Sequence, residues 1–233
     1  MVEAFAARPA YPMGLIDALA ELCSETGLVA EVGAGLGHVA LPLAERGLNV
    51  VAIEPALAML EGLREAARAR GVAVAAVHAT AEQLPLANGS VEALIVSDAL
   101  HFMDVVLAAA EFARVLVPGG ALAVVPCELA PTPFMRAVEV VMRDSAPRRP
   151  RNTAPAVIQV SRLLKAPYGP PRHFEDATAV DSQALERILR SISFIGPAMN
   201  ELRFARFLER IHALSDEPVW ARRFTLHAGR RAR

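Results

Sequence analysis

The chain has 233 residues, enough for one α/β domain with a full core and a small insertion. Apolar residues make up 54% of it, but no run approaches the ~18 uncharged residues of a membrane span, and the N-terminus lacks the apolar stretch of a signal peptide. Its two cysteines, Cys23 and Cys127, stand in no metal-binding or redox pattern. We therefore expect a reduced cytoplasmic protein without a membrane segment or a structural metal.

The net charge of −1 is distributed unevenly along the chain. Residues 1–130 carry 6 Arg and 15 acidic residues, whereas residues 131–233 carry 17 Arg and Lys165 against 10 acidic residues. This asymmetry indicates either an anionic partner for the basic half or two halves that complement each other. Because Lys is nearly absent from the chain, the abundance of Arg alone is weak evidence for such a partner.

Helices and strands are expected to alternate through the first 126 residues. The expected helices cover residues 13–26, a segment from the glycine-rich turn to about 46, about 55–70 and 105–116; the expected strands cover residues 28–32, 49–53, 72–77, 91–96 and 121–126, the last after a turn at 118–120. Such near-continuous apolar strands are typical of a parallel sheet buried on both faces. Right-handed crossovers then make the sheet doubly wound.

The pattern changes after residue 130. The expected helices here cover residues 133–145, 156–165, 182–193 and 199–214, and the expected strands cover residues 172–180 and 219–229. A strand pair that closes the sheet, with a helical lid inserted before it, would explain this order.

A glycine-rich turn follows the first expected strand, in the sequence VAEVGAGLG at residues 29–37. Its glycines are Gly33, Gly35 and Gly37, and His38 stands where the dinucleotide-binding fingerprint requires its third glycine. No Lys-Ser/Thr pair follows, which excludes a phosphate-binding P-loop. The turn therefore favours a nucleoside cofactor other than a dinucleotide.

Two acidic residues flank this turn. Glu31 lies inside an apolar strand, where an unpaired charge is costly, so it must meet a cation or hydrogen-bond donors. Glu54 ends the next strand, 21 residues after Gly33, where an acid reaches a ribose diol. The alternatives are a structural carboxylate that accepts backbone N–H groups for Glu31, and a helix N-cap for Glu54. Together with the glycines, the two acids favour ligand binding.

Further motifs follow the glycine turn in a fixed order. They are the acid Glu54, residues 79–86 (ATAEQLPL), residues 96–104 (VSDALHFMD) and residues 114–120 (RVLVPGG). With residues 31–37 (EVGAGLG), they resemble the five motifs of the class I S-adenosylmethionine-dependent methyltransferases with a type 11 domain, in order and spacing. Residues 8–12 (RPAYP) resemble the opening of a small-molecule branch that includes trans-aconitate methyltransferase, whereas residues 127–180 match nothing in that branch.

The resemblance implies a Rossmann-like, doubly wound α/β fold. Its seven-stranded sheet would be mostly parallel with an antiparallel final strand, and a helical lid would be inserted before the last strands. We expect a single methyltransferase domain over residues 1–233, made of an N-terminal helical segment (1–27), a cofactor-binding core (28–130), a variable substrate lid (131–180) and C-terminal helices with the closing strand (181–233).

The resemblance also implies S-adenosylmethionine as the cofactor and S-adenosylhomocysteine as its product. The glycines would let the methionine part approach the backbone, Glu31 would help set its amino group, and Glu54 would hold the ribose hydroxyls. Met59, Ala81 and Glu82 would lie near the adenine. The expected cofactor-binding residues are Tyr11, Glu31, Gly33, Ala34, Gly35, Gly37, Glu54, Pro55, Met59, Ala81, Glu82, Ser97 and Asp98.

The acceptor is expected to be a small molecule that carries an anionic carboxylate or a hydroxyl. His101 follows the fourth strand at the carboxyl edge of the sheet and could be a general base, or it could be a structural part of the turn. The arginine-rich residues 143–173 could attract an anionic substrate, or they could be a solvated loop. The expected substrate residues are Arg148, Arg162, Tyr168 and His173, and no metal ligand is expected.

Other functions stay open on the sequence alone. One is a protein that binds the cofactor without methyl transfer, and another is an NAD-linked oxidoreductase, against which His38 argues. An RNA or protein methyltransferase is a further alternative, but the near-zero net charge gives it no support. We expect no nucleic-acid or membrane partner, and a monomer or a homodimer.

Overall fold

The computed structural model describes residues 2–24, 26–147 and 153–232. The chain forms two compact units whose segments alternate along the sequence. The sheet unit comprises Tyr11–Cys127, Asn152–Phe174 and Phe224–Arg233, and the helical unit comprises Met1–Ala10, Glu128–Arg151 and Glu175–Arg223. The sequence predicted a single domain of four segments that meet near residues 27, 130 and 180. That division of the chain stays a prediction.

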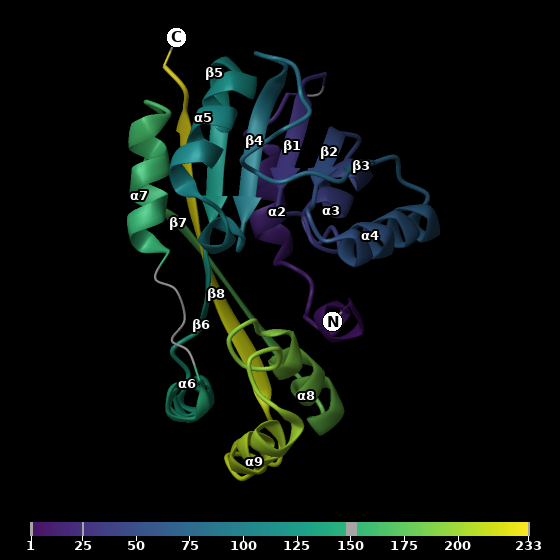
Figure 1. The fold of residues 1–233 in the computed structure, drawn as a ribbon, viewed down its shortest axis with the longest axis vertical. Coiled ribbons are helices and arrows are strands. Elements are labelled where there is room, and N and C mark those ends of the chain that lie inside the picture. Colours follow the sequence, from purple (N-terminus) through teal and green to yellow (C-terminus); the bar gives the residue numbers. More distant parts are fainter. Residues whose placement is uncertain (1, 25, 148–152, 233) are drawn as a thin grey trace. The chain divides into compact units, whose positions relative to one another are not determined.

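The sheet unit follows the predicted alternation of strands and helices (Figure 1). The helix α2 (Met13–Ala20) precedes the sheet. After it come β1 (Leu28–Val32), α3 (Ala40–Glu45), β2 (Asn49–Ile53), α4 (Leu57–Arg70), β3 (Ala75–Val77), β4 (Val91–Ser97), η1 (Leu100–Phe102), α5 (Val105–Val115) and β5 (Leu116–Val125).

The strands form one sheet in the order β3-β2-β1-β4-β5-β8-β6, and β7 (Arg172–Ala179) pairs with β8 (Val219–Arg230). The strands β1 to β5 are parallel to one another, whereas β8 runs antiparallel to β5. The predicted doubly wound sheet with an antiparallel final strand is therefore confirmed. The described residues form eight strands rather than seven, because Cys127–Leu129 forms the short strand β6, which the sequence did not predict.

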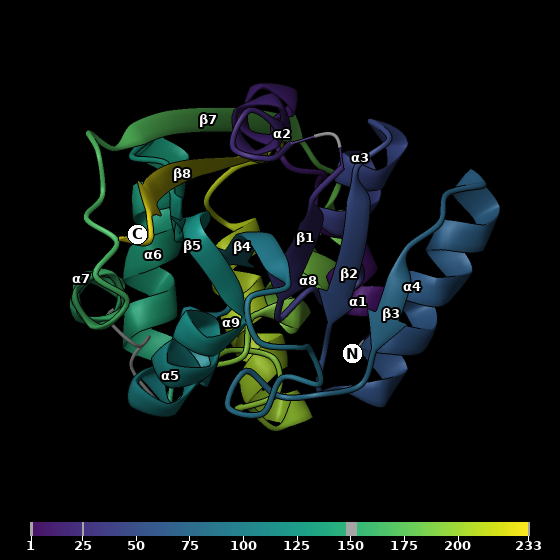
Figure 2. The same ribbon diagram turned by 90° about the horizontal axis from the view of Figure 1, so that it is seen from above.

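Apolar layers cover both faces of the parallel strands, which explains their continuous apolar sequences. Successive residues such as Val29 and Ala30 of β1 belong to opposite layers, because side chains alternate along a strand. One layer includes residues of α5 and α7 (Ala154–Leu163), and the other includes residues of α2 and α3. Figure 2 shows α2 and α3 on one side of the sheet and α5 on the other.

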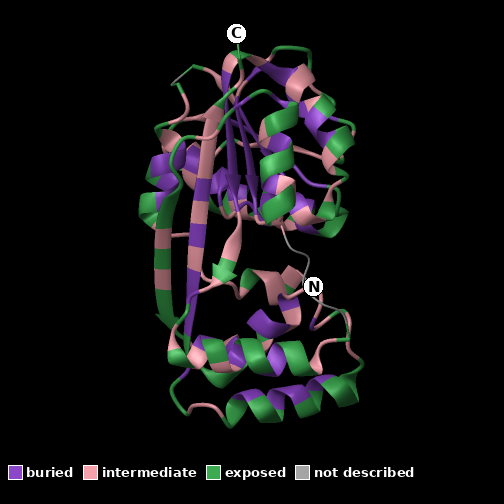
Figure 3. Cartoon of the chain, turned by 90° about the vertical axis from the view of Figure 1, so that its left-hand side faces the viewer, coloured by how far each residue is buried: buried purple, intermediate pink, exposed green. Residues whose placement is uncertain are grey.

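The helical unit contains α1 (Val2–Ala6), α6 (Pro133–Ser145), α8 (Ser182–Ser191) and α9 (Glu201–His212). The buried residues of its longer helices recur at helical spacing, as from Phe204 to Ile211 on α9, so that each buries one stripe. Figure 3 shows these buried stripes opposite exposed residues. Side-chain oxygens of Thr132, Asp181 and Asn200 accept backbone N–H groups and cap α6, α8 and α9.

Several predicted boundaries are wrong for local reasons. The helix α2 ends at Ala20 rather than at 26. The N–H groups of Leu22 and Cys23 donate to carbonyls three residues back, which tightens the chain into a turn. The helix α4 begins at Leu57, so Pro55 precedes it rather than lying in its first turn. Residues 118–120 belong to β5 rather than to a turn, because a register shift against β4 accommodates Gly119 at φ 80°.

The charge asymmetry of the sequence disappears in the folded units. By sequence, the helical unit contains 13 Arg and 12 acidic residues, and the sheet unit contains 10 Arg and one Lys against 13 acidic residues. The units therefore carry net charges of +1 and −2. Basic residues late in the chain balance acids early in the chain, which supports the interpretation that the two halves complement each other.

Candidate functional site

The glycine turn lies where β1 ends, between β2 and β4. The N–H groups of Gly33 and Ala34 both donate to the carbonyl of Ile53 at the end of β2, at 2.8 and 3.1 Å. Gly33 has φ 77°, and a Cβ atom there would lie 2.4 Å from the Cβ of Ala99. Gly37 has φ 81°, and its Cβ would press on Leu41 and Leu63. Glycine is therefore required at both positions by conformation and by space.

Glu31 is almost fully buried at 2% exposure. Its Oε2 accepts the N–H of Ala40, the first residue of α3, at 2.7 Å. This is the structural role that was the alternative for Glu31, since the amides of a first helical turn lack partners within the helix. Burial raises the pKa of Glu31 to about 8; the bond from Ala40 lowers this pKa, and the nearby Glu54 charge raises it.

Glu54 joins the glycine turn to the start of α4. Its Oε2 accepts the N–H of Gly35 at 2.8 Å, and its Oε1 accepts the N–H of Ala56 at 2.9 Å. Ala56 is the N-cap of α4, so Glu54 is not that cap. Each carboxylate oxygen has a second lone pair, so the held carboxylate can still accept hydroxyl groups.

Ser97 and Asp98 follow at the end of β4. Ser97 is buried, and its side chain is close enough to that of Tyr11 to lower the pKa of Tyr11. Asp98 adopts a left-handed conformation with φ 48°, and its N–H donates to the carbonyl of Val125 at 2.8 Å. A non-glycine residue at positive φ is a feature found at ligand sites.

Tyr11 packs close to this edge of the sheet. Its ring lies 4.8 Å from that of Phe224 and 6.4 Å from that of His38, measured between centroids. Burial, followed by the charge of Asp98, raises the pKa of Tyr11 above its ordinary value. The structure thus brings Tyr11 to Asp98, although 86 residues separate them in sequence.

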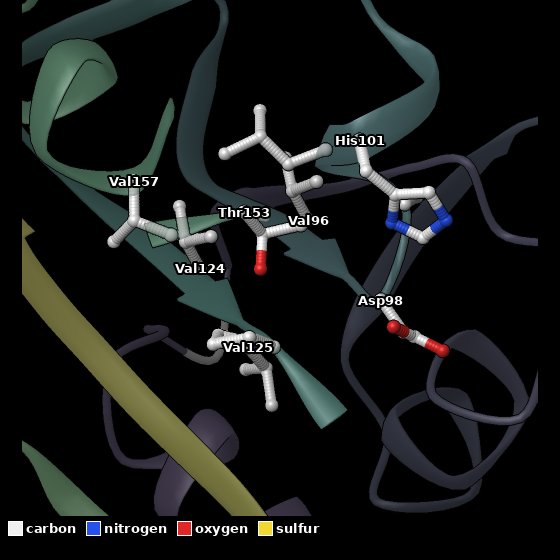
Figure 4. A pocket seen from close by; sticks show the side chains of 10 residues that line it. Val96, Asp98, His101, Val124, Val125, Thr153 and Val157 are labelled. Atoms are coloured by element: carbon white, nitrogen blue, oxygen red, sulfur yellow. The ribbon is translucent and has the colours of Figure 1, made fainter. Parts of the chain in front are cut away.

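His101 lies in η1, just beyond β4, and its ring is 4.0 Å from that of Phe102. It borders a pocket between the ends of β4 and β5 and the start of α7, and Figure 4 shows Asp98 and His101 at one side of it. The pocket is lined by Val96, Asp98, Ala99, Leu100, His101, Val124, Val125, Pro126, Thr153 and Val157. The sequence did not single out Thr153 and Val157 because they lie tens of residues beyond the last motif, and it did not single out Val124 and Val125 because they carry only aliphatic side chains.

Residues 30–124 match a protein-family model described as a methyltransferase domain. This part of the chain is therefore similar to methyltransferase domains. An uncharacterised methyltransferase of Mycobacterium tuberculosis is 41% identical to it over 150 residues, which are 64% of this chain. That match spans 59% of the length of the mycobacterial relative. S-adenosylmethionine, the cofactor that the motifs predicted, is bound in a solved geranyl diphosphate methyltransferase of similar fold.

Solved structures share the fold of this chain. The YcgJ protein of Bacillus subtilis has a TM-score of 0.67 and 20% identity, and the match covers 95% of this chain and all of YcgJ. Geranyl diphosphate C-methyltransferase of Streptomyces coelicolor, in complex with Mg²⁺, geranyl diphosphate and S-adenosylhomocysteine, has a TM-score of 0.58 and 14% identity. That match covers 94% of this chain and 78% of the other. At these identities the likeness shows the fold alone.

The residues expected at the adenine lie on α4 and on the segment between β3 and β4. Met59 and Ala81 are buried, whereas Pro55 is exposed. The ring Nε2 of His78 lies 2.9 Å from the carbonyl oxygen of Pro55, a contact that the sequence did not predict. Glu82 Oε1 accepts the N–H of Asp104 at 2.8 Å.

The described residues among those expected to bind the substrate, Arg162, Tyr168 and His173, do not line the His101 pocket. Arg148 lies outside the described residues, and Arg162 is exposed on α7. The ring of Tyr168 packs 5.5 Å from that of His227, and its hydroxyl is buried without a partner in the described part of the chain. His173 Nδ1 lies 3.2 Å from Thr225 Oγ1. Their assignment to the substrate stays a prediction.

Neither a membrane helix nor a metal cluster is found in the described parts of the chain. Over residues 2–24, 26–147 and 153–232, no helix has the length and apolar character needed to cross a membrane. In the same residues, no three His, Cys, Asp or Glu side chains are grouped so that they could hold a metal ion.

Proposed function

We propose that this protein transfers the methyl group of S-adenosylmethionine to a hydroxyl of a small, largely apolar molecule. The observation that carries the proposal is the edge of the sheet where the glycine turn, Glu31 and Glu54 meet the end of β4, directly beside the pocket of His101. Ligands of doubly wound folds bind at this carboxyl edge.

The residues at the edge fit the cofactor. The left-handed Gly33 lets the turn pack closely on Ala99, so that the turn and the end of β4 lie side by side at the proposed cofactor site. Glu54 offers its free lone pairs to ribose hydroxyls, and Glu31 offers a buried carboxylate to an ammonium group. The bound cofactor supplies an activated methyl group on a sulfonium. The protein contributes mainly by holding the acceptor oxygen in line with that methyl group.

The pocket beside His101 has a volume of about 10 Å³, so an acceptor must widen it on binding, but the chemistry of its lining favours an apolar acceptor with a hydroxyl. Its described lining is mostly aliphatic, and Asp98, His101 and Thr153 are its polar side chains. Bidentate recognition of a carboxylate would require an arginine, and none belongs to that lining. Arg172, which the sequence placed in the basic lid, pairs with Glu21 at 2.8 Å instead. We therefore favour the hydroxyl over the carboxylate.

A hydroxyl acceptor must lose its proton as it gains the methyl group. In this proposal an imidazole nitrogen of His101 takes that proton while the new C–O bond forms. Geranyl diphosphate C-methyltransferase, which shares this fold, binds a small molecule together with S-adenosylhomocysteine. Two units with net charges near zero give no support to a nucleic-acid acceptor.

The proposal is tested with a pool of small hydroxylated and carboxylated metabolites and methyl-labelled S-adenosylmethionine. We expect release of S-adenosylhomocysteine and a labelled ether in the hydroxylated pool, identified by mass spectrometry. Glu54→Ala should abolish the signal, whereas Glu65→Ala, which changes an exposed acid on α4, should not. Binding of S-adenosylhomocysteine without product from any pool would favour a cofactor-binding protein, and a labelled ester would reverse our choice of acceptor.

A further inference from the structure

The segment between β3 and β4 carries Ala81 and Glu82, the residues expected at the adenine, but contains little regular structure. Its regular pairing in the described residues is a single bridge between Thr80 and Gln83. An irregular wall can preorganise a binding site only when other groups fix its backbone. In this protein the side chains of α5 fix it.

Arg114, at the end of α5, uses all of its N–H donors on this segment and on one acid. Its Nη1 donates to the carbonyl of Leu86 at 2.7 Å and to Asn88 Oδ1 at 2.8 Å, and its Nη2 donates to the carbonyl of Leu84 at 2.8 Å. Its Nε and Nη2 donate to the two oxygens of Glu111, both at 2.7 Å. A guanidinium has five N–H donors, so each one has an acceptor.

Glu111 also forms a hydrogen bond with the backbone of Leu84. Its Oε2 also accepts the N–H of Leu84 at 2.8 Å, so one residue of the segment has both backbone groups bound by the Glu111–Arg114 pair. The hydrogen bonds from Arg114 are the main cause that lowers the pKa of Glu111, which therefore stays charged at neutral pH. The side chain of Leu84 is buried in the same apolar layer as α5.

The other end of α5 holds the segment through Glu82. Glu82 Oε1 accepts the N–H of Asp104, and Asp104 Oδ1 in turn accepts the N–H groups of Val106 and Leu107 as the N-cap of α5. Asp104 stands three residues after His101. The segment between β3 and β4 is thus tied to both ends of one helix, and at one end it adjoins the loop of His101.

We propose that Arg114 is a positioning residue for cofactor binding: by fixing Leu84, Leu86 and Asn88 it places Ala81 and Glu82 against the adenine. The inference rests on the proposed use of S-adenosylmethionine. Arg114 and Glu111 are partly exposed, at 31% and 20% of their side chains, and a single exposed ion pair contributes little. The contribution of Arg114 comes from its bidentate bond to Glu111 together with three bonds to the segment.

The test is the affinity of S-adenosylhomocysteine and of adenosine, measured by calorimetry with the full chain. Arg114→Lys keeps the charge but cannot make five directed bonds. We expect this variant to lower the affinity for both ligands by the same factor, about 10-fold, because the backbone that it no longer fixes contacts the adenine, which both ligands share. Glu31→Gln should weaken S-adenosylhomocysteine but not adenosine, which has no amino acid part.

The matched control is Arg46→Lys. Arg46 also bonds to one acid, Asp17, and to one backbone carbonyl, that of Pro42, but it follows α3 at the end away from the glycine turn. It should leave both affinities within about twofold. Equal affinities for the two ligands in the Arg114 and Arg46 variants would overturn the inference. It would also be overturned if the Arg114 variant lost affinity for S-adenosylhomocysteine but not for adenosine.

Two outcomes separate this inference from the proposed function. If the wild-type protein does not bind S-adenosylhomocysteine, the proposed function fails before Arg114 is tested. If Arg114→Lys does not fold, Asn88→Ala is the second test, because it removes one of the three hydrogen bonds from Arg114 to the segment between β3 and β4. It should lower the affinity for adenosine by about threefold. Unchanged adenosine affinity in that folded variant would overturn the role of Arg114.

Discussion

Glu31 and Glu54 lie within one sheet edge but are held in different ways. Glu54 accepts backbone N–H groups on both oxygens, so its carboxylate is stabilised where it stands. Glu31 has a single bond, from Ala40, and is almost completely buried. Desolvation therefore dominates at Glu31, and a positively charged ligand group would relieve it.

This difference predicts a pH dependence that Glu31→Gln removes. The pKa of Glu31 in the folded protein, about 8, is above its ordinary value of 4.5, so its contribution to stability is complete below pH 4.5 and is lost as pH rises through 8. Between pH 5 and 8, the free energy of unfolding of the wild type should fall relative to Glu31→Gln by on the order of 3 kcal/mol. Denaturant titrations of both proteins at each pH measure this difference.

The same titration should affect cofactor binding in the opposite direction. Ionised Glu31 attracts an ammonium group, so the affinity of the wild type for S-adenosylhomocysteine should increase from pH 6 to 8, whereas that of Glu31→Gln should not. Parallel pH profiles of the two proteins would contradict the assignment of Glu31 to the amino group.

His101→Ala tests whether this residue moves a proton. If His101 is the base, turnover should fall by about 10²- to 10⁴-fold while the dissociation constant of S-adenosylhomocysteine changes by less than about threefold. Phe102→Leu is the control, because it removes the ring packed on the imidazole and leaves the imidazole itself. Equal turnover in wild type and His101→Ala would leave His101 a structural part of its turn.

At the scale of an element, both the backbone conformation of the glycine turn and its packing against Ala99 require glycine at position 33. Gly33→Ala would combine a positive φ with a Cβ atom 2.4 Å from that of Ala99. Gly47→Ala is a matched control, because Gly47 has φ 81° and its Cβ would meet nothing within 4 Å. Gly47→Ala should cost about 1 kcal/mol of stability, and Gly33→Ala should cost more and also abolish cofactor binding.

Chemical denaturation and calorimetry measure the two effects of these alanine variants. Equal stability of the two variants would mean that the contact with Ala99 relaxes freely. Retained binding of S-adenosylhomocysteine by Gly33→Ala would contradict the assignment of the turn to the cofactor. Since Ala99 follows Asp98, a shift there would also move the left-handed residue at the end of β4.

Sequence predicted those elements whose signals are local. The helix α5 is an example, because its apolar run predicted a helix over residues 105–116 and the structure has it at Val105–Val115, with Asp104 as its N-cap. The start of β5 is a counterexample, since Pro118 and Gly119 signal a turn, whereas in the structure they lie in a register shift against β4 and the N–H of Gly119 donates to the carbonyl of Arg231. Pairing between distant strands overrides a local preference of this kind.

At the scale of the whole molecule, segments distant in sequence share a unit. Asp176 and Arg222 of the helical unit form a buried ion pair, with 17% and 7% of their side chains exposed, and Arg222 also donates to the carbonyl of Ala10. Next to them, Glu175 and Arg223 form an exposed pair, with 54% and 41% exposed. The two pairs join the same strands but differ in burial.

Burial predicts different effects of removing one partner from each pair. Asp176→Ala leaves a buried guanidinium without its carboxylate and should destabilise the protein by about 3–5 kcal/mol. Glu175→Ala should change stability by less than about 1 kcal/mol. Denaturant midpoints measured at equal slope give both values, and similar losses in the two variants would contradict the difference that burial predicts.

By itself, the sequence determined the sheet, the order along the chain of its parallel strands and helices, and the edge at which we expect the cofactor. These follow from apolar periodicity, from glycine spacing and from an acid at a strand end, all of which are signals within a few residues. Only the tertiary structure decided that Arg114 holds residues 84–88, that Thr153 and Val157 border the pocket of His101, and that the charges balance within each unit. Those contacts join residues tens of positions apart or more, and they depend on how the chain crosses the sheet rather than on any local pattern.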